Sequence, residues 1–222
     1  MPRKAWQAGT TMIPQIVLDY FLSALTTLMV TVDPPGLAPI FLSLTLGMTG
    51  TERRAVAIRA TIIAGGIMLG FAFFGQPVLG ALGIGFPAFR IAGGLLLFWI
   101  AFEMIFEIRT QRKSSVARTA IDQDHIHNVA AFPLAIPLMA GPGTITATML
   151  LAGNAGGNGM KLGALVVVIA IVAVACLAVF LIADRLSKLL GVTGNLVLTR
   201  LLGVILAALA VQFVIDGVKA IL

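Results

Sequence analysis

Six long apolar segments, separated by short polar stretches, dominate the hydrophobic pattern of this chain. Each of them can supply the roughly 20 residues that a helix needs to cross the hydrocarbon layer of a bilayer. The pattern predicts helices over about 17–46, 55–76, 87–108, 129–152, 161–183 and 195–219. We therefore expect an all-α membrane protein, with residues 1–222 forming a single integral membrane domain.

Two clusters of proline and glycine interrupt the apolar pattern inside the first and the fourth predicted helices. They are Asp33-Pro34-Pro35-Gly36 and Gly141-Pro142-Gly143. A break in a membrane helix frees backbone N–H and C=O groups, so it is tolerated only where protein buries it or where it lines a cavity. Matched breaks in two halves of a chain indicate a transport site near the bilayer midplane. We expect the first and fourth helices to be broken there.

The two halves of the chain resemble each other on either side of a hydrophilic stretch. A shift of 108 positions places Pro34 on Pro142, and a shift of 110 positions places Arg90 on Arg200. Because each half holds an odd number of helices, the second half has the opposite orientation, which makes an inverted repeat. The predicted parts are a first three-helix repeat over 17–108, a cytoplasmic linker over 109–128 and a second, inverted three-helix repeat over 129–220.

Composition and charge agree with a membrane location. Hydrophobic residues make up 59% of the chain and charged residues 11%, whereas soluble domains carry about 25% charge. The mean hydropathy is +1.05. The net charge of +6 does not indicate nucleic-acid binding, since lysine and arginine cluster in the loops between the spans, as the positive-inside rule describes. The same rule predicts that both termini are extracytoplasmic. The apolar composition makes the lipid bilayer the expected main partner.

The two breaks define the candidate binding residues. Each break begins a second half-helix whose first N–H groups are free and whose N-terminus carries a partial positive charge. Such an end binds anions, a carboxylate among them. In an inverted repeat the two N-termini approach each other near the centre. The expected substrate-binding residues are therefore Asp33, Pro34, Pro35, Gly36, Gly141, Pro142, Gly143, Thr144 and Thr146.

Asp33 is the only carboxylate placed well inside a predicted span. A charge at that depth costs at least ~2.5–3.5 kcal/mol, so acidic residues in membrane helices are functional by default. Asp33 could bind a substrate ammonium, accept a proton or hold Na⁺. It is equally suited to capping the half-helix that follows it. Coupling by H⁺ or Na⁺ stays open, and no other cofactor is expected.

Further charged residues suggest gates rather than catalysis. Arg90 and Arg200 begin the third helix of each repeat, where they either extend to the membrane surface or form a gate or an internal ion pair. Glu103, near the cytoplasmic end of its helix, is a partner for arginine or an interface residue.

The motif at Asp122, Asp124, His125 and His127 resembles a metal site, but its polar surroundings favour a solvated loop, so no metal site is expected. The chain shows no catalytic triad, no paired catalytic carboxylates and no phosphate-binding loop, so we do not expect an enzyme.

Residues 33–45, which begin Asp33-Pro34-Pro35-Gly36, resemble the first-helix signature of the MarC family of multi-pass membrane proteins. Residues 132–146, which contain Gly141-Pro142-Gly143, resemble its fourth-helix signature. The resemblance covers nearly the whole chain. It implies a six-helix protein of the prokaryotic inner membrane, related to LysE-type exporters and to transporters of small neutral amino acids.

The resulting functional prediction is a secondary transporter of small solutes, above all small neutral amino acids. It would work by alternating access at a site between the two broken helices. A channel-like exporter of another metabolite is one alternative, and a non-transporting membrane protein with a stress or regulatory role is another. A homo-oligomer is permitted by the glycines on the helix faces.

Overall fold

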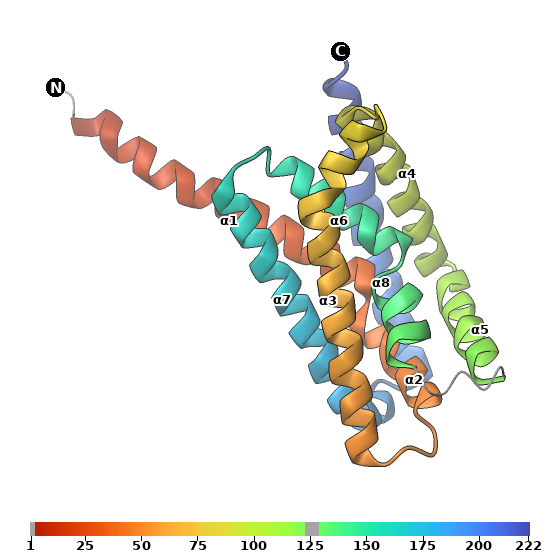
Figure 1. The fold of residues 1–222 in the computed structure, drawn as a ribbon. Coiled ribbons are helices and arrows are strands. Elements are labelled where there is room, and N and C mark those ends of the chain that lie inside the picture. The colour runs from red at the N-terminus through yellow and green to blue at the C-terminus, as the bar shows by residue number, and fades with distance from the viewer. Residues whose placement is uncertain (1–2, 123–128) are drawn as a thin grey trace.

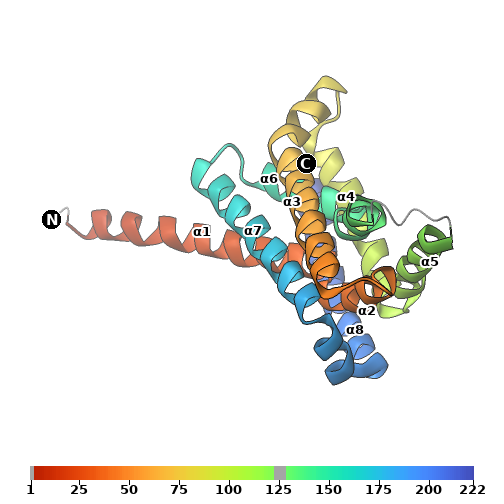
Figure 2. The same ribbon diagram turned by 60° about the horizontal axis from the view of Figure 1, so that its bottom comes forward.

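The computed structural model describes residues 3–122 and 129–222, and the elements in this part of the chain are helices (Figure 1). They are α1 (Arg3–Val32), α2 (Pro34–Leu44), α3 (Gly50–Ala81), α4 (Phe86–Ile105), α5 (Ile108–Asp122), the π-helical segment η2 (Ala130–Met139), α6 (Pro142–Asn154), α7 (Gly159–Leu181) and α8 (Ala183–Lys219). The helices form an elongated bundle, from which the first part of α1 extends away, as Figure 2 shows. The prediction of an all-α fold is confirmed.

Five helical stretches among the described residues are long and apolar enough to cross a membrane. They are Gln15–Leu44, Gly50–Ala81, Phe86–Ile105, Gly159–Leu181 and Thr193–Lys219. The pair η2 and α6, which is bent by 59°, makes a sixth if it is taken as one span. The predicted multi-pass architecture is therefore confirmed. The inverted relation of the halves and the depth of the breaks in the bilayer stay predictions.

The backbone changes direction at Asp33, between α1 and α2. Asp33 has a left-handed conformation with φ 59° and ψ 65°, which few residues other than glycine adopt. Pro34 and Pro35 occupy the first positions of α2, where their missing N–H groups remove no helical hydrogen bond. The Asp33 carboxylate caps α2 by accepting a hydrogen bond of 3.1 Å from the Gly36 N–H.

Prolines also shape the segment between residue 129 and α6. Pro133 and Pro137 lie inside η2, and the residues before them, Phe132 and Ile136, have extended backbone angles. Since the residue before a proline is pushed away from helical angles, η2 is an irregular helix rather than a continuous one. A new helix, α6, begins at Pro142.

Helices α4 and α8 form the most extensive helix pair of the bundle. They lie side by side and run in opposite directions (Figure 1). Glycines allow this close approach: a Cβ added at Gly94 would lie 2.8 Å from the Ala210 carbonyl oxygen, and one at Gly203 would lie 3.1 Å from that of Ala101. Small residues let membrane helices pack backbone against backbone in this way.

The polarity of the predicted linker over 109–128 favours a loop, which is wrong for the described part, because residues 109–122 belong to the helix α5. This helix contacts α2, α4 and η2, and it buries Arg109 and Lys113. A spacing of four residues places both side chains on one helical face, where they bond to carbonyl groups of α1. The motif residues Asp124, His125 and His127 lie outside the described residues. The cytoplasmic location of this segment stays a prediction.

Candidate functional site

A cavity of about 360 Å³ opens beside the break before α6. Its wall consists of the start of α6, the last turn of η2, and side chains from α4 and α5. The residues are Leu96, Trp99, Ile100, Arg109, Arg112, Lys113, Val116, Pro137, Leu138, Gly141, Pro142, Gly143 and Thr144. Three of them are basic and none is acidic, so we refer to it as the cationic cavity.

The N-terminus of α6 faces this cavity without a side-chain cap. Gly141 is the capping residue and contributes no side-chain hydrogen bond. Intrahelical bonding begins with the Ile145 N–H, which donates to the Gly141 carbonyl at 3.0 Å. The N–H groups of Gly143 and Thr144 therefore have no acceptor within the helix. Together with the helix dipole they make the wall of the cavity attractive to an anion.

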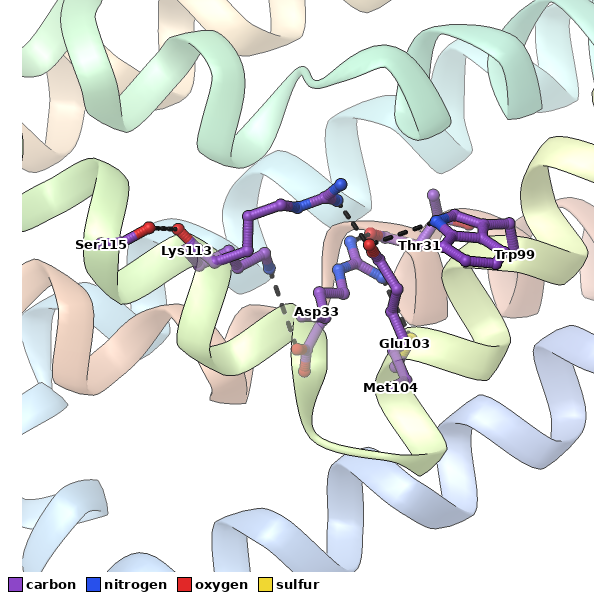
Figure 3. A network of polar contacts seen from close by, with 9 residues as sticks. Thr31, Asp33, Trp99, Glu103, Met104, Lys113 and Ser115 are labelled. Carbon is purple, nitrogen blue, oxygen red and sulfur yellow. Dashed lines mark hydrogen bonds and ion pairs between the residues drawn. The ribbon is translucent and has the colours of Figure 1, made fainter.

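The basic residues of α5 connect the cavity to the end of α1 (Figure 3). Arg109 donates a hydrogen bond to the Thr31 carbonyl. The Lys113 ammonium donates to the Val32 carbonyl at 3.4 Å. These carbonyls belong to the last turn of α1. The last carbonyls of a helix receive no intrahelical hydrogen bonds and carry a partial negative charge. Arg109 and Lys113 therefore stabilise the break between α1 and α2 from outside the broken helix.

Two buried carboxylates balance the basic residues. The Arg112 guanidinium lies 2.9 Å from the Glu103 carboxylate, which also accepts a hydrogen bond of 3.2 Å from Trp99 Nε1. Lys113 Nζ lies 3.9 Å from the nearer carboxylate oxygen of Asp33. Asp33 and Glu103 are each only 3% exposed. Because buried charges are tolerated when they are paired, this network allows three basic side chains to line one cavity.

The charge of Lys113 is strongly affected by this environment. Burial, and to a lesser extent the nearby Arg109, lower its pKa from the usual 10.5 to about 7, although Asp33 acts to raise it. The side chain therefore changes protonation close to neutral pH, although its residue type is normally charged there. Burial also lowers the pKa of Arg109.

The structure places the predicted binding residues in two groups. Gly141, Pro142, Gly143 and Thr144 line the cationic cavity. The others are not among its lining residues. The first break consists of Asp33, Pro34, Pro35 and Gly36, and Asp33 contacts Lys113 there. Thr146 lies beside Gly93 of α4. The two breaks are nevertheless adjacent, because a Cβ added at Gly143 would lie 3.7 Å from Cγ2 of Thr31.

The remaining predicted residues lie at opposite ends of the α4–α8 pair. Arg90 donates hydrogen bonds to the Asn154 side chain and to the Asp216 carbonyl, the latter at 3.4 Å. Arg200 forms an ion pair with Glu107. Each arginine thus connects different helices at its own end of the bundle. Glu103, the third residue of this group, contacts neither arginine and pairs with Arg112 instead.

Sequence reasoning missed the contribution of α5 and of Trp99. Arg109, Arg112, Lys113 and Val116 follow the spacing i, i+3, i+4, i+7, which places them on one helical face. That period was the available signal. It was hidden because the segment is polar as a whole, and polarity favoured a loop.

The comparisons with known proteins agree with this architecture. Residues 18–222 match the MarC family of integral membrane proteins. The chain belongs to the MarC family. A UPF0056 membrane protein of Methanocaldococcus jannaschii is 36% identical over 206 residues, which cover 92% of this chain and 98% of the relative.

Two bacterial relatives are similar in sequence to this MarC family protein over most of its length. The UPF0056 membrane protein YhcE of Escherichia coli is 35% identical over 193 residues, 86% of this chain and 87% of its own. YvbG of Bacillus subtilis is 32% identical over 209 residues, 92% and 96% of the two chains. No solved structure matches significantly. These names place the chain in a membrane and specify no substrate.

Proposed function

We propose that this MarC family protein is a secondary transporter of small solutes that carry a carboxylate, above all small neutral amino acids. The observation that supports this most directly is the uncapped N-terminus of α6, which opens into a cavity lined by three basic side chains. Broken helices whose positive ends face a central cavity are the usual carboxylate sites of such transporters.

The substrate carboxylate would bind at the start of α6. The free N–H groups of Gly143 and Thr144 supply donors, and the helix dipole adds a fixed partial charge. Arg112 is the basic residue best placed to reach a solute, because its side chain is 56% exposed whereas those of its buried neighbours are tied to α1. A guanidinium can bind a carboxylate through two parallel hydrogen bonds.

The ammonium of an amino acid would bind at the other side of the same break. Pro137 and Leu138, from the last turn of η2, also line the cavity. Pro142 has no N–H group and so cannot donate to a carbonyl of that turn. The C-terminal end of a half-helix carries a partial negative charge and coordinates cations in transporters.

The two breaks therefore take different roles in this proposal. Asp33 is engaged by the Gly36 N–H and by Lys113, so we assign it to holding the first break rather than to the substrate. The arginine contacts at the two ends of the α4–α8 pair are the proposed gates. Opening the Arg90 contacts would admit solute from one side, and opening the Arg200–Glu107 pair would admit it from the other.

Counterflow in proteoliposomes tests the proposal. Vesicles containing the protein are preloaded in turn with glycine, alanine, serine and threonine, and uptake of the labelled solute is followed. We expect saturable exchange in the wild type and its loss in Gly143→Leu, because a Cβ at Gly143 would already meet Ile100 at 2.1 Å. Gly163→Leu is the matched control, since the space around Gly163 is open.

A second variant tests the role proposed for Arg112, which is to bind the carboxylate of the substrate. Arg112→Gln removes one charged donor, which is worth about 1.5–3 kcal/mol, so we expect KM to rise roughly tenfold or more. Linear, non-saturable flux in the wild type would instead indicate a channel-like exporter. No flux of any of the four solutes would indicate another solute or a non-transporting role.

A further inference from the structure

A second cavity, of about 260 Å³, lies between α2, α5 and α8. These three helices meet at the lower end of the molecule in Figure 1. Thr110 and Ser114 line it, and each follows directly after Arg109 or Lys113 of the cationic cavity. One helix therefore separates two cavities. Within the described part of the chain, the residues lining the second cavity include no charged side chain, and we refer to it as the neutral cavity.

Two buried polar atoms at the wall of the neutral cavity have no hydrogen-bond partner among the residues that the structure describes. They are Oγ of Ser187 and Oδ1 of Asn195, both on α8. Buried polar atoms in native proteins are almost always satisfied, so an unsatisfied pair in a cavity indicates a bound water or ion. Oδ1 of an asparagine can only accept, so what binds it must be a donor or a cation.

In addition to these two side-chain atoms, a backbone carbonyl of α2 lacks a hydrogen-bond donor within its helix. Pro39 lies inside α2 and, like Pro35, lines the neutral cavity. A proline cannot donate the helical hydrogen bond to the carbonyl four residues earlier. The Pro35 carbonyl thus lacks its regular intrahelical donor.

The break in α8 contributes a further negative end. Gly191 has φ 59° and ψ −174°, which interrupts the helix between Ser187 and Asn195. The first part of α8 therefore ends at Leu190 and Gly191, and both residues line the cavity. The last carbonyls of a helix have no intrahelical donors and carry a partial negative charge.

We infer that the neutral cavity binds a small inorganic monovalent cation, for which Na⁺ is the probe. Its wall offers oxygen acceptors and a negative helix end, and its hydroxyls at Thr110 and Ser114 supply further oxygen atoms. Hard cations prefer oxygen ligands, and transporters bind Na⁺ with carbonyls at half-helix ends. A cavity of this volume holds the ion together with part of its hydration shell. An anion finds no basic partner there.

The cation would be the coupling ion of the transporter, and this role rests on the proposed function. Both cavities contact α5, and the neutral cavity also contacts Pro35 next to the first break. Binding of the cation would therefore hold α5 and α2 together with α8. Binding of the cation can be tested without any transport assay.

Thermal unfolding of the purified full-length protein in detergent measures the binding. Tm is compared in NaCl and in choline chloride at equal ionic strength. We expect NaCl to raise Tm by roughly 3–6 °C at ten times the Kd. We expect the rise to disappear in Asn195→Leu and to shrink by more than half in Ser187→Ala. Gln212→Leu, which removes an amide from the exposed surface of the same helix, keeps the full rise.

An equal Tm in the two salts, or an equal NaCl effect in Asn195→Leu and the wild type, would overturn the inference and leave a cavity filled with water. Transport is then measured with and without Na⁺. If no solute is transported but the Na⁺-specific rise in Tm is present, the cation site stands and the proposed function fails. If exchange is saturable but Na⁺ changes neither Tm nor flux, the proposed function stands and the cation site fails.

Discussion

Lys113 Nζ lies 3.9 Å from the carboxylate of Asp33, and this contact joins α5 to the break between α1 and α2. The same carboxylate caps α2 through the Gly36 N–H. Asp33 thus satisfies a helix end and a buried cation together. These contacts support the assignment of Asp33 to holding the broken helix, which needs partners for all of its freed groups.

Substitutions of Asp33 separate the cap from the ion pair. Asp33→Asn keeps an oxygen that accepts from Gly36 but loses the charge, whereas Asp33→Ala loses both. A lost cap costs about 1 kcal/mol, and loss of the charge also leaves Lys113 without its acidic partner. We therefore expect the free energy of unfolding to fall from wild type to Asp33→Asn and further to Asp33→Ala. Denaturation in mixed micelles measures it, and equal stabilities of the two variants would contradict the cap.

Gly36 is predicted to be indispensable for the same cap. A Cβ added there would lie 2.1 Å from a carboxylate oxygen of Asp33. We expect Gly36→Ala to displace this carboxylate and to destabilise the protein about as much as Asp33→Ala. Because both changes disrupt the contacts of the same carboxylate, the double variant should be little worse than either single one. Additive losses in the unfolding measurements would show that Gly36 acts separately from Asp33.

Stability should depend on pH through Lys113. Its pKa in the folded protein is about 7 and its ordinary value is 10.5. Between these values the unfolded chain binds more protons, so the free energy of unfolding should rise as pH increases from about 7 to 10. Lys113→Met should flatten this rise when unfolding is measured across that range. Lys188→Met, at an exposed position of α8, should leave it intact.

The two arginine contacts should differ in their effect on stability. The Arg200–Glu107 pair is exposed, with 51% and 31% of the two side chains accessible, so Glu107→Gln should cost no more than about 1 kcal/mol. Arg90 already has a buried Nε without a partner, and Asn154→Ala would leave a second of its donors unpaired. That loss should cost about 1–3 kcal/mol in the free energy of unfolding. Equal losses would argue against this distinction.

The spans were predictable because hydropathy reports burial in lipid directly, but their ends were not. The second span was expected over 55–76 and extends over Gly50–Ala81. Its start is fixed by a capping box, in which Thr49 and Glu52 satisfy each other's backbone groups. This signal was present in the sequence. It is too local and too polar to register in a hydropathy pattern.

Of the candidate site, only the breaks in the helix backbone were predictable from the sequence. Proline and glycine mark the two breaks regardless of tertiary structure, so residues such as Gly141 and Gly143 could be found from sequence. The basic residues of the cationic cavity could not be assigned in this way. Arg109 and Lys113 become buried only because carbonyls of α1, which are remote in sequence, accept their hydrogen bonds.

The buried face of α5 also constrains how the protein is made. A segment containing Arg109, Arg112, Lys113 and Arg118 is too polar for the translocation machinery to release into lipid as a span. Membrane proteins first insert their apolar helices and then assemble them. Helix α5 would therefore dock after the spans have been inserted, and until then Asp33 and the last carbonyls of α1 lack these partners. The cationic cavity is in this sense a late product of biogenesis, and chains stalled before docking would present the broken helix to the quality-control proteases of the membrane.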